Sequence, residues 1–441
     1  MISVRAEGRE RYIVELLAEV TGVPSGDWLV VEVRDGGGIG WDGRRLTLGS
    51  DLVNSILEAL DGRGDPKRPL VDELALRFGD EVRSALESRG LPFVSLWRWP
   101  EGRPFALFLS HDVDQVRRRD PVILARDVYR MGRDLLRGRF RKAASVARGW
   151  TGDDPYWNFE SWMELEGKLG VRSTFFVMEG PRWARYGRRY DTRKLGPVLR
   201  ELSEGGWEIG LHGSYYSCGD ATRLKDEKDA LEEIAGTRVL GNRQHYLRFI
   251  PEVSFRCYER AGFLYDSTLG YNEVVGYRAG TSLPFRPYDP ERGRMEVLEL
   301  PLGIQDVAVE GTEEAFGLAE RVREGGGMLS LLWHQSAFYR SPLYEELIRW
   351  AQACGAWIAK GEEIALWWRA REKVRVRALW EPPELHLELS EVPEGLVLSV
   401  AMPGGGEDTV PALPGRYPVD GGRVVIRWRS RGCPNFLWCR S

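Results

Sequence analysis

The chain has 441 residues, with 62 Lys and Arg against 66 Asp and Glu, which gives a formal net charge of −4 at pH 7. This balance excludes a general binder of nucleic acid, because such proteins carry a strong basic excess. Hydrophobic residues make up 43% and charged residues 29% of the chain, a composition that excludes extended disorder. A chain of this length predicts two to four domains.

The sequence shows no signal for export or membrane insertion. Residues 1–10 lack the basic stretch and apolar core of a secretion signal, and no later apolar run reaches membrane length. The cysteines are scattered and odd in number, which favours reduced thiols over a zinc knuckle; they are Cys218, Cys257, Cys354, Cys433 and Cys439. Together these features predict a cytoplasmic protein.

Residues 1–100 are predicted to form a small mixed α/β module. Helical periodicity covers residues 11–20, 52–60 and 71–88, and an apolar run at 28–33 favours a strand. No chemical motif occurs in this part of the chain, so the sequence predicts no role for it.

Residues 101–371 alternate short apolar runs with amphipathic stretches, the pattern of repeated βα units around a parallel sheet. The predicted strands are 105–110, 173–178, 207–211, 239–242, 263–266, 297–300 and 328–333. The predicted helices between them include 157–169, 195–204, 224–234 and 343–353. Seven strands that alternate with helices fit a (β/α) barrel slightly short of eight strands, so that the whole chain belongs to the α/β class.

Residues 372–441 return to a period of two between turns rich in Pro and Gly. The predicted strands are 374–377, 384–389, 396–400 and 424–428. They predict a small all-β module at the C-terminus.

Four of the five histidines fall at or beside the ends of predicted strands in the barrel region; they are His111, His212, His245 and His334. Reactive groups gather at the carboxyl ends of strands in parallel βα folds, because the loops there converge on one mouth. Any one of these histidines is more readily explained as a hydrogen-bonded core residue. Four of them beside acidic residues favour a site.

The first acidic cluster follows the predicted strand 105–110. Side chains alternate along a strand, so Asp112 and Asp114 should face one side while His111 faces the other. One carboxylate could bind a divalent metal while the other acts as a general base toward water. The alternative is an Asx turn or helix cap after the strand.

His212 follows a second apolar strand, with a glycine behind it that allows close backbone approach. This histidine could be a metal ligand or a buried core residue. The metal ligand is the more specific of the two interpretations.

Several motifs then occur in the order known from the polysaccharide deacetylases, also called carbohydrate esterase family four or the NodB-homology type. The runs are LSHDVD at 109–114, STFFV at 173–177, EIGLH at 208–212, RQHY at 243–246 with AGF at 261–263, YDST at 265–268 and LSLLWH at 329–334. Each run alone is weak, whereas the ordered series is specific. The resemblance covers about residues 104–360 and leaves both terminal modules unexplained. It implies a distorted seven-stranded (β/α) barrel, in agreement with the seven predicted strands.

The resemblance implies roles for individual residues. Asp112 resembles the family's catalytic base, and Arg243 resembles the arginine that orients that base. Asp114 and His212 resemble metal ligands, and His334 resembles the histidine that protonates the leaving group. The expected cofactor is a divalent metal, zinc above all.

The chain departs from the family at one position. Four residues after His212 the family usually has a second histidine, where this chain has Tyr216. Tyrosine is a poor neutral ligand for zinc, so another side chain must complete the site, or the metal is bound weakly or not at all. His245 is the predicted replacement, and His111 is the second choice.

Three residues are predicted to contact substrate. Backbone N–H groups near Tyr215 would stabilise an oxyanion. Arg278 and Arg286, in a loop bounded by Gly and Pro, could grip an anionic group, although surface salt bridges are an equal alternative. Asp306 could be an acid that supports a residue of the site without contacting substrate, although a loop cap is the favoured explanation.

Residues 116–150 form an arginine-dense insertion with interspersed apolar residues. A solvated basic helix is the favoured interpretation. The alternative is contact with a membrane surface or a lipid- or nucleotide-linked sugar.

The predicted function is a metal-dependent hydrolase that removes an acetyl group from an N-acetylated sugar of a glycan or glycan precursor. One alternative is hydrolysis of the C–N bond of a small non-sugar amide. The other is a non-catalytic glycan-binding protein on a deacetylase scaffold, which Tyr216 and the β-rich C-terminal module suggest.

Overall fold

The structure is a computed structural model that describes residues 1–66, 68–117, 121–138, 156–182, 186–188, 190–382, 384–401, 403, 415–418 and 423–427. Part of the arginine-rich insertion and two cysteines lie outside these residues: Arg118, Arg119, Arg139, Arg141, Lys142, Cys433 and Cys439. The three described cysteines, Cys218, Cys257 and Cys354, are free thiols.

The N-terminal part packs helices against a small mixed sheet. Its strands, in the order β1-β2-β4-β3, are β1 (Ile2–Arg5), β2 (Leu29–Arg34), β4 (Arg45–Gly49) and β3 (Ile39–Trp41). Its helices are α1 (Gly8–Thr21), α2 (Ser50–Glu58), the π-helical turn η1 (Ala59–Arg63) and α3 (Leu70–Ser88). The apolar stripe of α3 is buried, Phe78 and Val82 completely. The helices and the strand predicted from periodicity are confirmed here.

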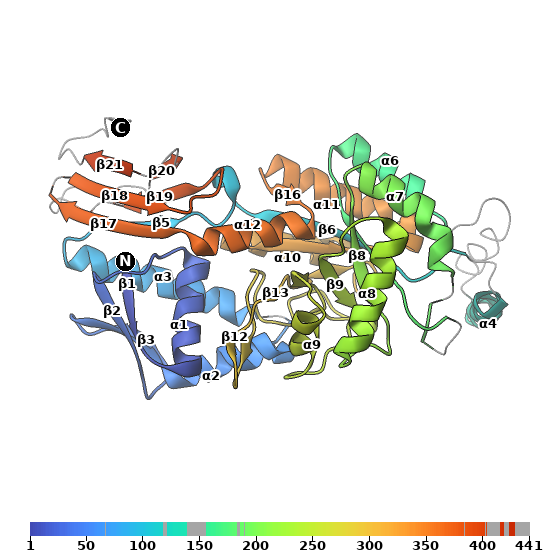
Figure 1. Ribbon diagram of the computed structural model, residues 1–441, viewed down its shortest axis with the longest axis horizontal. Helices are drawn as coiled ribbons and strands as arrows, with labels where there is room; N and C mark the ends of the chain where they lie inside the picture. Colours follow the sequence, from blue (N-terminus) through green and yellow to red (C-terminus); the bar gives the residue numbers. More distant parts are fainter. Residues whose placement is uncertain are drawn as a thin grey trace.

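The centre of the molecule is a parallel sheet, seen in the middle and right of Figure 1. Among the described residues it has nine strands, in the order β13-β10-β9-β8-β7-β6-β15-β14, with β16 also paired to β6. Their bounds are β6 (Ala106–Val113), β7 (Thr174–Val177), β8 (Glu208–Gly213), β9 (Gly241–Gln244), β10 (Tyr265–Asp266), β13 (Leu298–Glu299), β14 (Ile304–Gln305), β15 (Met328–Leu332) and β16 (Trp357–Ala359). The predicted count of seven is not confirmed, because the short strands β14 and β16 add to the seven predicted.

The sheet curls toward closure. Its two outermost strands, β13 and β14, are consecutive in the chain, with Glu299 and Ile304 five residues apart. Five residues span at most about 17 Å, so the two edges of the sheet must come close together. The chain is therefore a mixed α/β protein whose curled parallel sheet approximates the predicted barrel.

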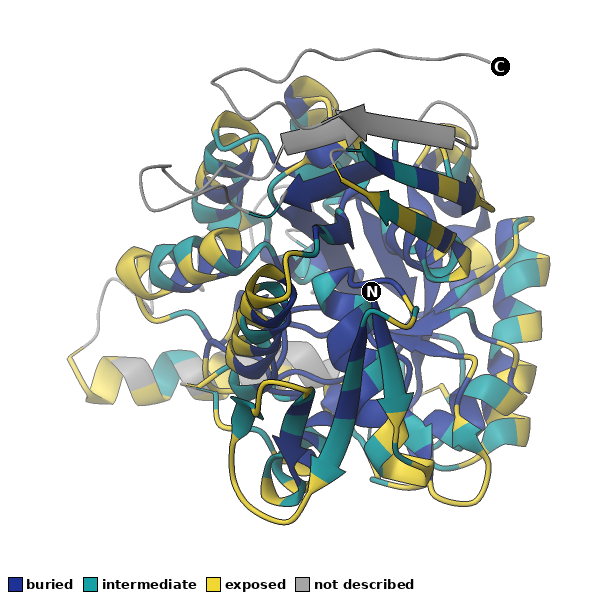
Figure 2. Cartoon of the chain, turned by 90° about the vertical axis from the view of Figure 1, so that its left-hand side faces the viewer, coloured by how far each residue is buried: buried dark blue, intermediate teal, exposed yellow. Residues whose placement is uncertain are grey.

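Helices and short turns cover the sheet. The α-helices are α6 (Phe159–Leu169), α7 (Gly196–Glu204), α8 (Ala221–Ala235), α9 (Ser254–Arg260), α10 (Thr312–Gly325), α11 (Ser341–Ala353) and α12 (Gly361–Lys373). The 3-10 helices are η2 (Pro100–Gly102), η3 (Thr192–Leu195), η4 (His245–Leu247) and η5 (Gln335–Arg340). Every residue of β6, β7 and β8 is buried. In Figure 2 the central sheet is dark blue, the colour of buried residues, and the surrounding helices carry the exposed residues in yellow. Burial on both faces explains why these strands read as continuous apolar runs.

The C-terminal strands join the N-terminal part of the chain. They are β17 (Arg375–Glu381), β18 (Glu384–Ser390), β19 (Val397–Ala401), β20 (Gly415–Pro418) and β21 (Arg423–Arg427). β19 pairs with β5 (Phe93–Leu96), from the segment predicted as the N-terminal module, and the two lie together at upper left in Figure 1. The predicted boundaries at residues 100 and 371 therefore stay predictions.

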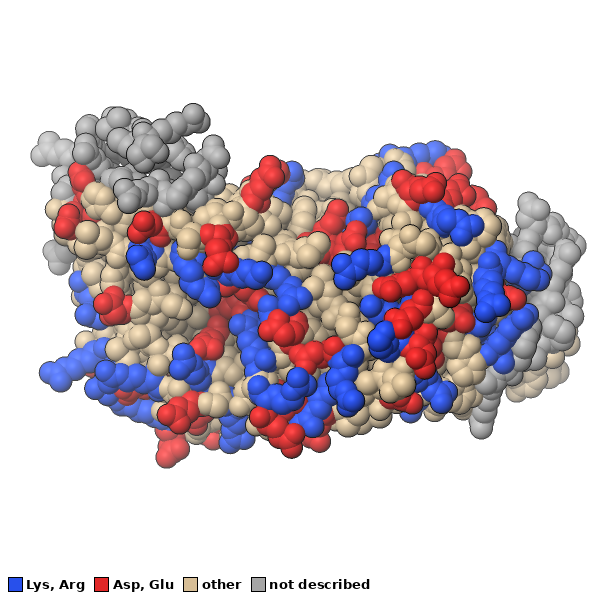
Figure 3. Space-filling view, in the orientation of Figure 1, with Lys and Arg blue, Asp and Glu red and all other residues tan. Residues whose placement is uncertain are grey.

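Two surface features bear on the predicted partners. Basic and acidic side chains are interspersed over the face in Figure 3, with no field of one sign. Helix α4 (Pro121–Leu136) lies apart from the body at one end (Figure 1). Arg133 in this helix and Arg137 just after it are exposed. No helix in the described part of the chain is both long and apolar enough to span a membrane.

Candidate metal centre

The carboxyl ends of β6, β8, β9 and β15 meet around one cavity of about 430 Å³. Its lining includes Asp112, Asp114, His212, His245 and His334. Asp112 lies near the end of β6 and Asp114 follows that strand, β8 carries His212, and η4 begins with His245 directly after β9. The parallel pairing of these strands brings together residues far apart in the chain.

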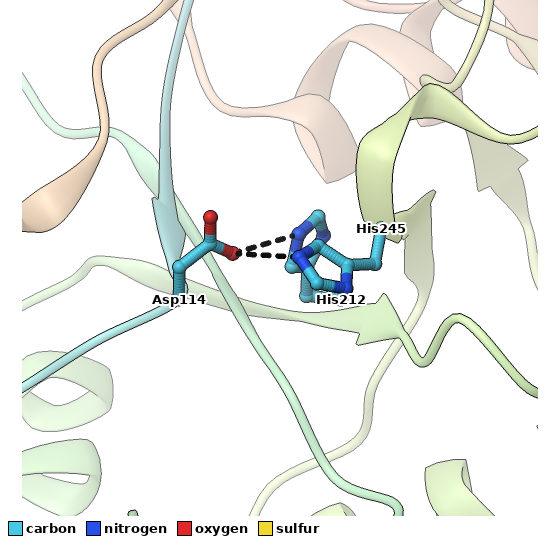
Figure 4. Close-up of side chains that lie close together, drawn as sticks. All are labelled: Asp114, His212 and His245. Carbon is cyan, nitrogen blue, oxygen red and sulfur yellow. Dashed lines mark ion pairs between the residues drawn. The ribbon is translucent and has the colours of Figure 1, made fainter. Parts of the chain in front are cut away.

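Asp114, His212 and His245 form a group whose ligand atoms lie within 4.8 Å of one another. The Oδ1 atom of Asp114 lies 3.2 Å from Nε2 of His212 and 3.7 Å from Nε2 of His245, and both contacts are drawn in Figure 4. Ligand atoms about 2.1 Å from a tetrahedral ion lie roughly 3.4 Å from each other. The spacing of this group therefore fits a divalent metal.

Hydrogen bonding supports the same conclusion. Nδ1 of His212 donates to the backbone carbonyl of Arg243 at 2.9 Å, which directs Nε2 at Asp114. Burial lowers the pKa of His212, but Asp112 and Asp114 raise it above its usual value. A cation bound between His212 and Asp114 would therefore replace a proton on Nε2.

The pKa values of two ligands also agree with metal binding. Burial lowers the pKa of His245 to about 4, so its imidazole is neutral, the form that coordinates a metal. Burial alone would raise the pKa of Asp114, but the nearby His245 and His212 hold it below its usual range. Asp114 is therefore a carboxylate at neutral pH.

Asp112 is held by Arg243 beside the three ligands. Nη1 of Arg243 donates to Oδ1 of Asp112 at 3.0 Å, and Oδ2 lies 3.7 Å from Nε2 of His212. The fully buried guanidinium is fixed by Ser110 and Ser267, and it stacks 4.3 Å from the ring centre of Phe176. One oxygen of Asp112 is thereby anchored while the other faces the ligand group.

His334 forms a close pair with Asp306, which follows β14. Its Nδ1 lies 2.6 Å from Oδ1 of Asp306, and its Nε2 lies 3.7 Å from Oδ2 of Asp114. Burial would lower the pKa of His334, but Asp306 raises it to about 10. The favoured explanation of Asp306 as a loop cap is wrong, because its side chain binds this histidine.

His111, the second choice as a metal ligand, faces away from the cavity. Its Nδ1 donates to the carbonyl of Trp333 at 2.8 Å, and its Nε2 lies 2.9 Å from Glu166. It is fully buried between Trp162 and Phe175. Strand alternation explains this orientation, so we correct His111 to a core histidine.

Tyr215 and Tyr216 are not among the residues that line the cavity. Tyr215 stacks on Tyr186 with ring centres 4.3 Å apart, and Tyr216 packs edge-on against Tyr215 at 5.6 Å. The aromatic side chain at the cavity is Tyr246, which is 53% exposed and stacks on His245 at 4.2 Å. Tyr215 therefore reaches the site indirectly: its ring centre lies 6.3 Å from that of Tyr246, which lines the cavity.

The structure does not bring Arg278 and Arg286 to the cavity lining. Arg278 donates to the backbone carbonyls of Gly62 and Leu247. Arg286 pairs with Glu296 and Glu372, both at 2.7 Å. We therefore correct the predicted substrate contacts of both arginines to structural bonds.

Replacing Arg286 with alanine is expected to lower the free energy of unfolding by roughly 1–2 kcal/mol, because the buried carboxylate of Glu372 loses one of its two arginine partners and keeps only Arg294. Urea denaturation measures this loss. Arg349→Ala is the matched control, since its pair with Glu345 is exposed and is worth less than about 1 kcal/mol. Full stability with weaker substrate binding would restore the predicted substrate contact.

Sequence patterns missed part of the cavity wall. Asn272, Glu273 and Gln305 line the cavity, yet they belong to loops or a two-residue strand without a motif.

A second cavity of about 620 Å³ lies between α1, α2 and α9. No histidine lines it, so the smaller cavity holds the candidate metal centre.

Comparison with known proteins finds no matching family model and no matching curated protein. Among solved structures, a putative polysaccharide deacetylase from Mycobacterium smegmatis is 22% identical, covers 64% of this chain and 96% of its own, and has a TM-score of 0.42. The peptidoglycan deacetylase PdaC from Bacillus subtilis is 14% identical, with coverage of 62% and 96% and a TM-score of 0.32. A CE4 family pseudoenzyme from Bacillus anthracis is 11% identical, with coverage of 59% and 65% and a TM-score of 0.32. These values are too low to assign an activity, which must rest on the residues of this chain.

Proposed function

We propose that the protein is a metal-dependent hydrolase that removes the acetyl group from an N-acetylated sugar. The observation that carries this proposal is the convergence of three functional units on one cavity. They are the ligand group Asp114, His212 and His245, the Arg243–Asp112 pair and the Asp306–His334 pair. Each unit supplies one requirement of amide hydrolysis.

A divalent cation held by Asp114, His212 and His245 would act as a Lewis acid toward a carbonyl oxygen and increase the acidity of water. Two imidazoles and one carboxylate are a ligand set that zinc accepts in catalytic sites. Oδ2 of Asp112 faces this group and takes the proton of the attacking water. Arg243 keeps Asp112 correctly oriented, because it binds the other oxygen.

His334 supplies the proton for the leaving group. Its Nδ1–H is engaged by Asp306, which leaves Nε2–H directed at the cavity. With a pKa of about 10, the ring is an imidazolium at neutral pH. It therefore donates a proton to the departing amine nitrogen as the C–N bond breaks.

A sugar is the proposed carrier of the acetyl group. The exposed ring of Tyr246 and the polar side chains of Asn272 and Glu273 stand at the same cavity, a combination that suits a ring with several hydroxyl groups. A cytoplasmic location, which stays a prediction, would favour a glycan precursor over an assembled polymer.

Metal removal tests this proposal. The purified protein should contain one divalent ion per chain and release acetate from N-acetylated sugars. A chelator should abolish acetate release, and zinc should restore it. His212→Ala should contain no metal and remain inactive after zinc is added, because a ligand is lost.

The test also separates the alternatives. Hydrolysis of cyclic amides without acetate release from sugars would favour a hydrolase of small non-sugar amides. Glycan binding by a protein that takes up no metal would contradict the proposal and favour a binding protein.

A further inference from the structure

The loop between β10 and β13 forms one wall of the cavity. Asn272 and Glu273, near its start, line the cavity, and both are exposed. Nδ2 of Asn272 donates to the carbonyl of Tyr246 at 3.0 Å, which ties this wall to the segment that carries His245. Glu273 has no hydrogen bond or ion pair to any described residue, so its carboxylate is free to accept one from a ligand.

The N-terminal part of the chain holds this loop in place through its backbone. Gly64 N donates to the carbonyl of Arg278 at 3.1 Å, and Val71 N donates to the carbonyl of Gly280 at 2.9 Å. In return, the hydroxyl of Tyr271, the residue before Asn272, donates to the carbonyl of Gly64. Residues 62–66 and 70–72 therefore lie along the loop and bond to it repeatedly.

Asp72, in the first turn of α3, makes the main side-chain contact to the loop. Its Oδ1 accepts from the hydroxyl of Thr281 at 2.5 Å. Its Oδ2 accepts from the backbone N–H of Ser282 at 2.9 Å and from the Ser282 hydroxyl at 2.7 Å. Hydrogen bonds to a charged acceptor are stronger than neutral ones, so this carboxylate holds the middle of the loop at Thr281 and Ser282.

The fit between the two segments is close enough to require glycine. A Cβ atom on Gly276, whose φ is +144°, would lie 2.3 Å from the carbonyl oxygen of Pro66. A Cβ atom on Gly64 would lie 2.7 Å from the carbonyl oxygen of Arg278. Both distances are below any normal contact, so the two segments are packed backbone to backbone.

We infer that the N-terminal module completes the substrate site: Asp72 positions the loop that presents Glu273, which accepts hydrogen bonds from the hydroxyl groups of the sugar. This inference rests on the proposed function. Asp72 is a positioning residue, because it acts through the loop, while Glu273 contacts the substrate. The module thus contributes to the affinity for sugars and leaves the chemistry to the metal centre.

The test compares two substrates and five variants. Glu273→Ala and Asp72→Ala should each raise the KM for an N-acetylglucosamine oligosaccharide about tenfold, the effect of losing one or two hydrogen bonds to a charged group. For both variants the KM for the oligosaccharide should rise by a larger factor than its kcat falls, because the lost hydrogen bond belongs to substrate binding. The second substrate, 4-nitrophenyl acetate, is too small to contact the loop, so its hydrolysis reports on the metal centre alone. The double variant should be no worse than the poorer single variant, because both changes disable the same contact.

Two controls isolate the loop. Val31→Ala removes buried volume from β2 of the same module, and Glu310→Ala removes an exposed carboxylate that does not line the cavity. Both should keep the wild-type KM. In Asp72→Ala, hydrogen exchange at the Ser282 amide should accelerate, whereas Val31→Ala should leave it unchanged.

The outcomes distinguish this inference from the proposed function. Multiplicative effects in the double variant, or an unchanged KM in Asp72→Ala, would overturn the role of Asp72 with the proposed function intact. A wild-type protein that releases no acetate from the oligosaccharide would instead overturn the proposed function. In that case, titration with the oligosaccharide and exchange at Ser282 still decide whether Glu273 binds sugar and Asp72 holds the loop.

Discussion

Asparagine in place of Asp112 is expected to lower kcat roughly 10³-fold, the usual contribution of a general base, and to leave the metal content unchanged. The Oδ1 atom of asparagine can still accept the hydrogen bond that Arg243 now donates to Asp112 at 3.0 Å. The geometry of the pair is therefore preserved, while the amide cannot take a proton. Acetate release and metal analysis on the same sample measure both effects.

Asp289→Asn is the matched control for this variant. Asp289 is also a buried aspartate bound by an arginine, Arg256, but it lies outside the cavity. Its replacement should change kcat by less than about twofold, since surface or structural changes away from the reacting atoms alter no transition-state contact. If Asp112→Asn kept full activity with bound metal, another group would have to be the base.

The strands that frame the site could be predicted because their sequences obey a local rule. β6, β7, β8 and β15 are buried on both faces and therefore read as apolar runs. β14 and β16 have two and three residues, too short for any period to be visible. The pairing of β5 with β19 joins residues about 300 positions apart, and no local pattern encodes such a contact.

The same distinction applies to the side chains of the site. Asp112, Asp114 and His212 follow recognisable strands, so their convergence could be predicted from strand ends. The pairing of Asp306 with His334 and the contact of Asp72 with Thr281 depend on the tertiary structure.

The arginines whose predicted substrate contacts were corrected show where a local sequence pattern is not sufficient. Arg286 lies in a loop bounded by Gly and Pro, where an arginine can serve a substrate or a buried acid equally well. Only the position of Glu372, which lies in α12, decides between the two.

Replacing His245 with alanine is expected to weaken metal binding by more than roughly 10- to 100-fold. A loss of that size is typical when a residue that hydrogen-bonds to a metal ligand is mutated, and the loss of the ligand itself should cost more. Activity should fall in proportion to the metal lost. His245 is the side chain that replaces the histidine absent at Tyr216, and it lies 3.7 Å from Oδ1 of Asp114. Without it the site keeps one imidazole and one carboxylate, fewer protein ligands than catalytic zinc sites use. Metal titration with a competing chelator measures the affinity.

Two other histidines provide matched controls. His111→Ala should keep the metal but lower the free energy of unfolding, because His111 binds Glu166 on the opposite side of β6. His386→Ala should change neither quantity, since His386 lies on β18 and is 39% exposed. If His245→Ala bound metal as tightly as the wild type, the third ligand would be another residue. The further change Tyr216→His in that variant would then show whether the position four residues after His212 reaches the metal.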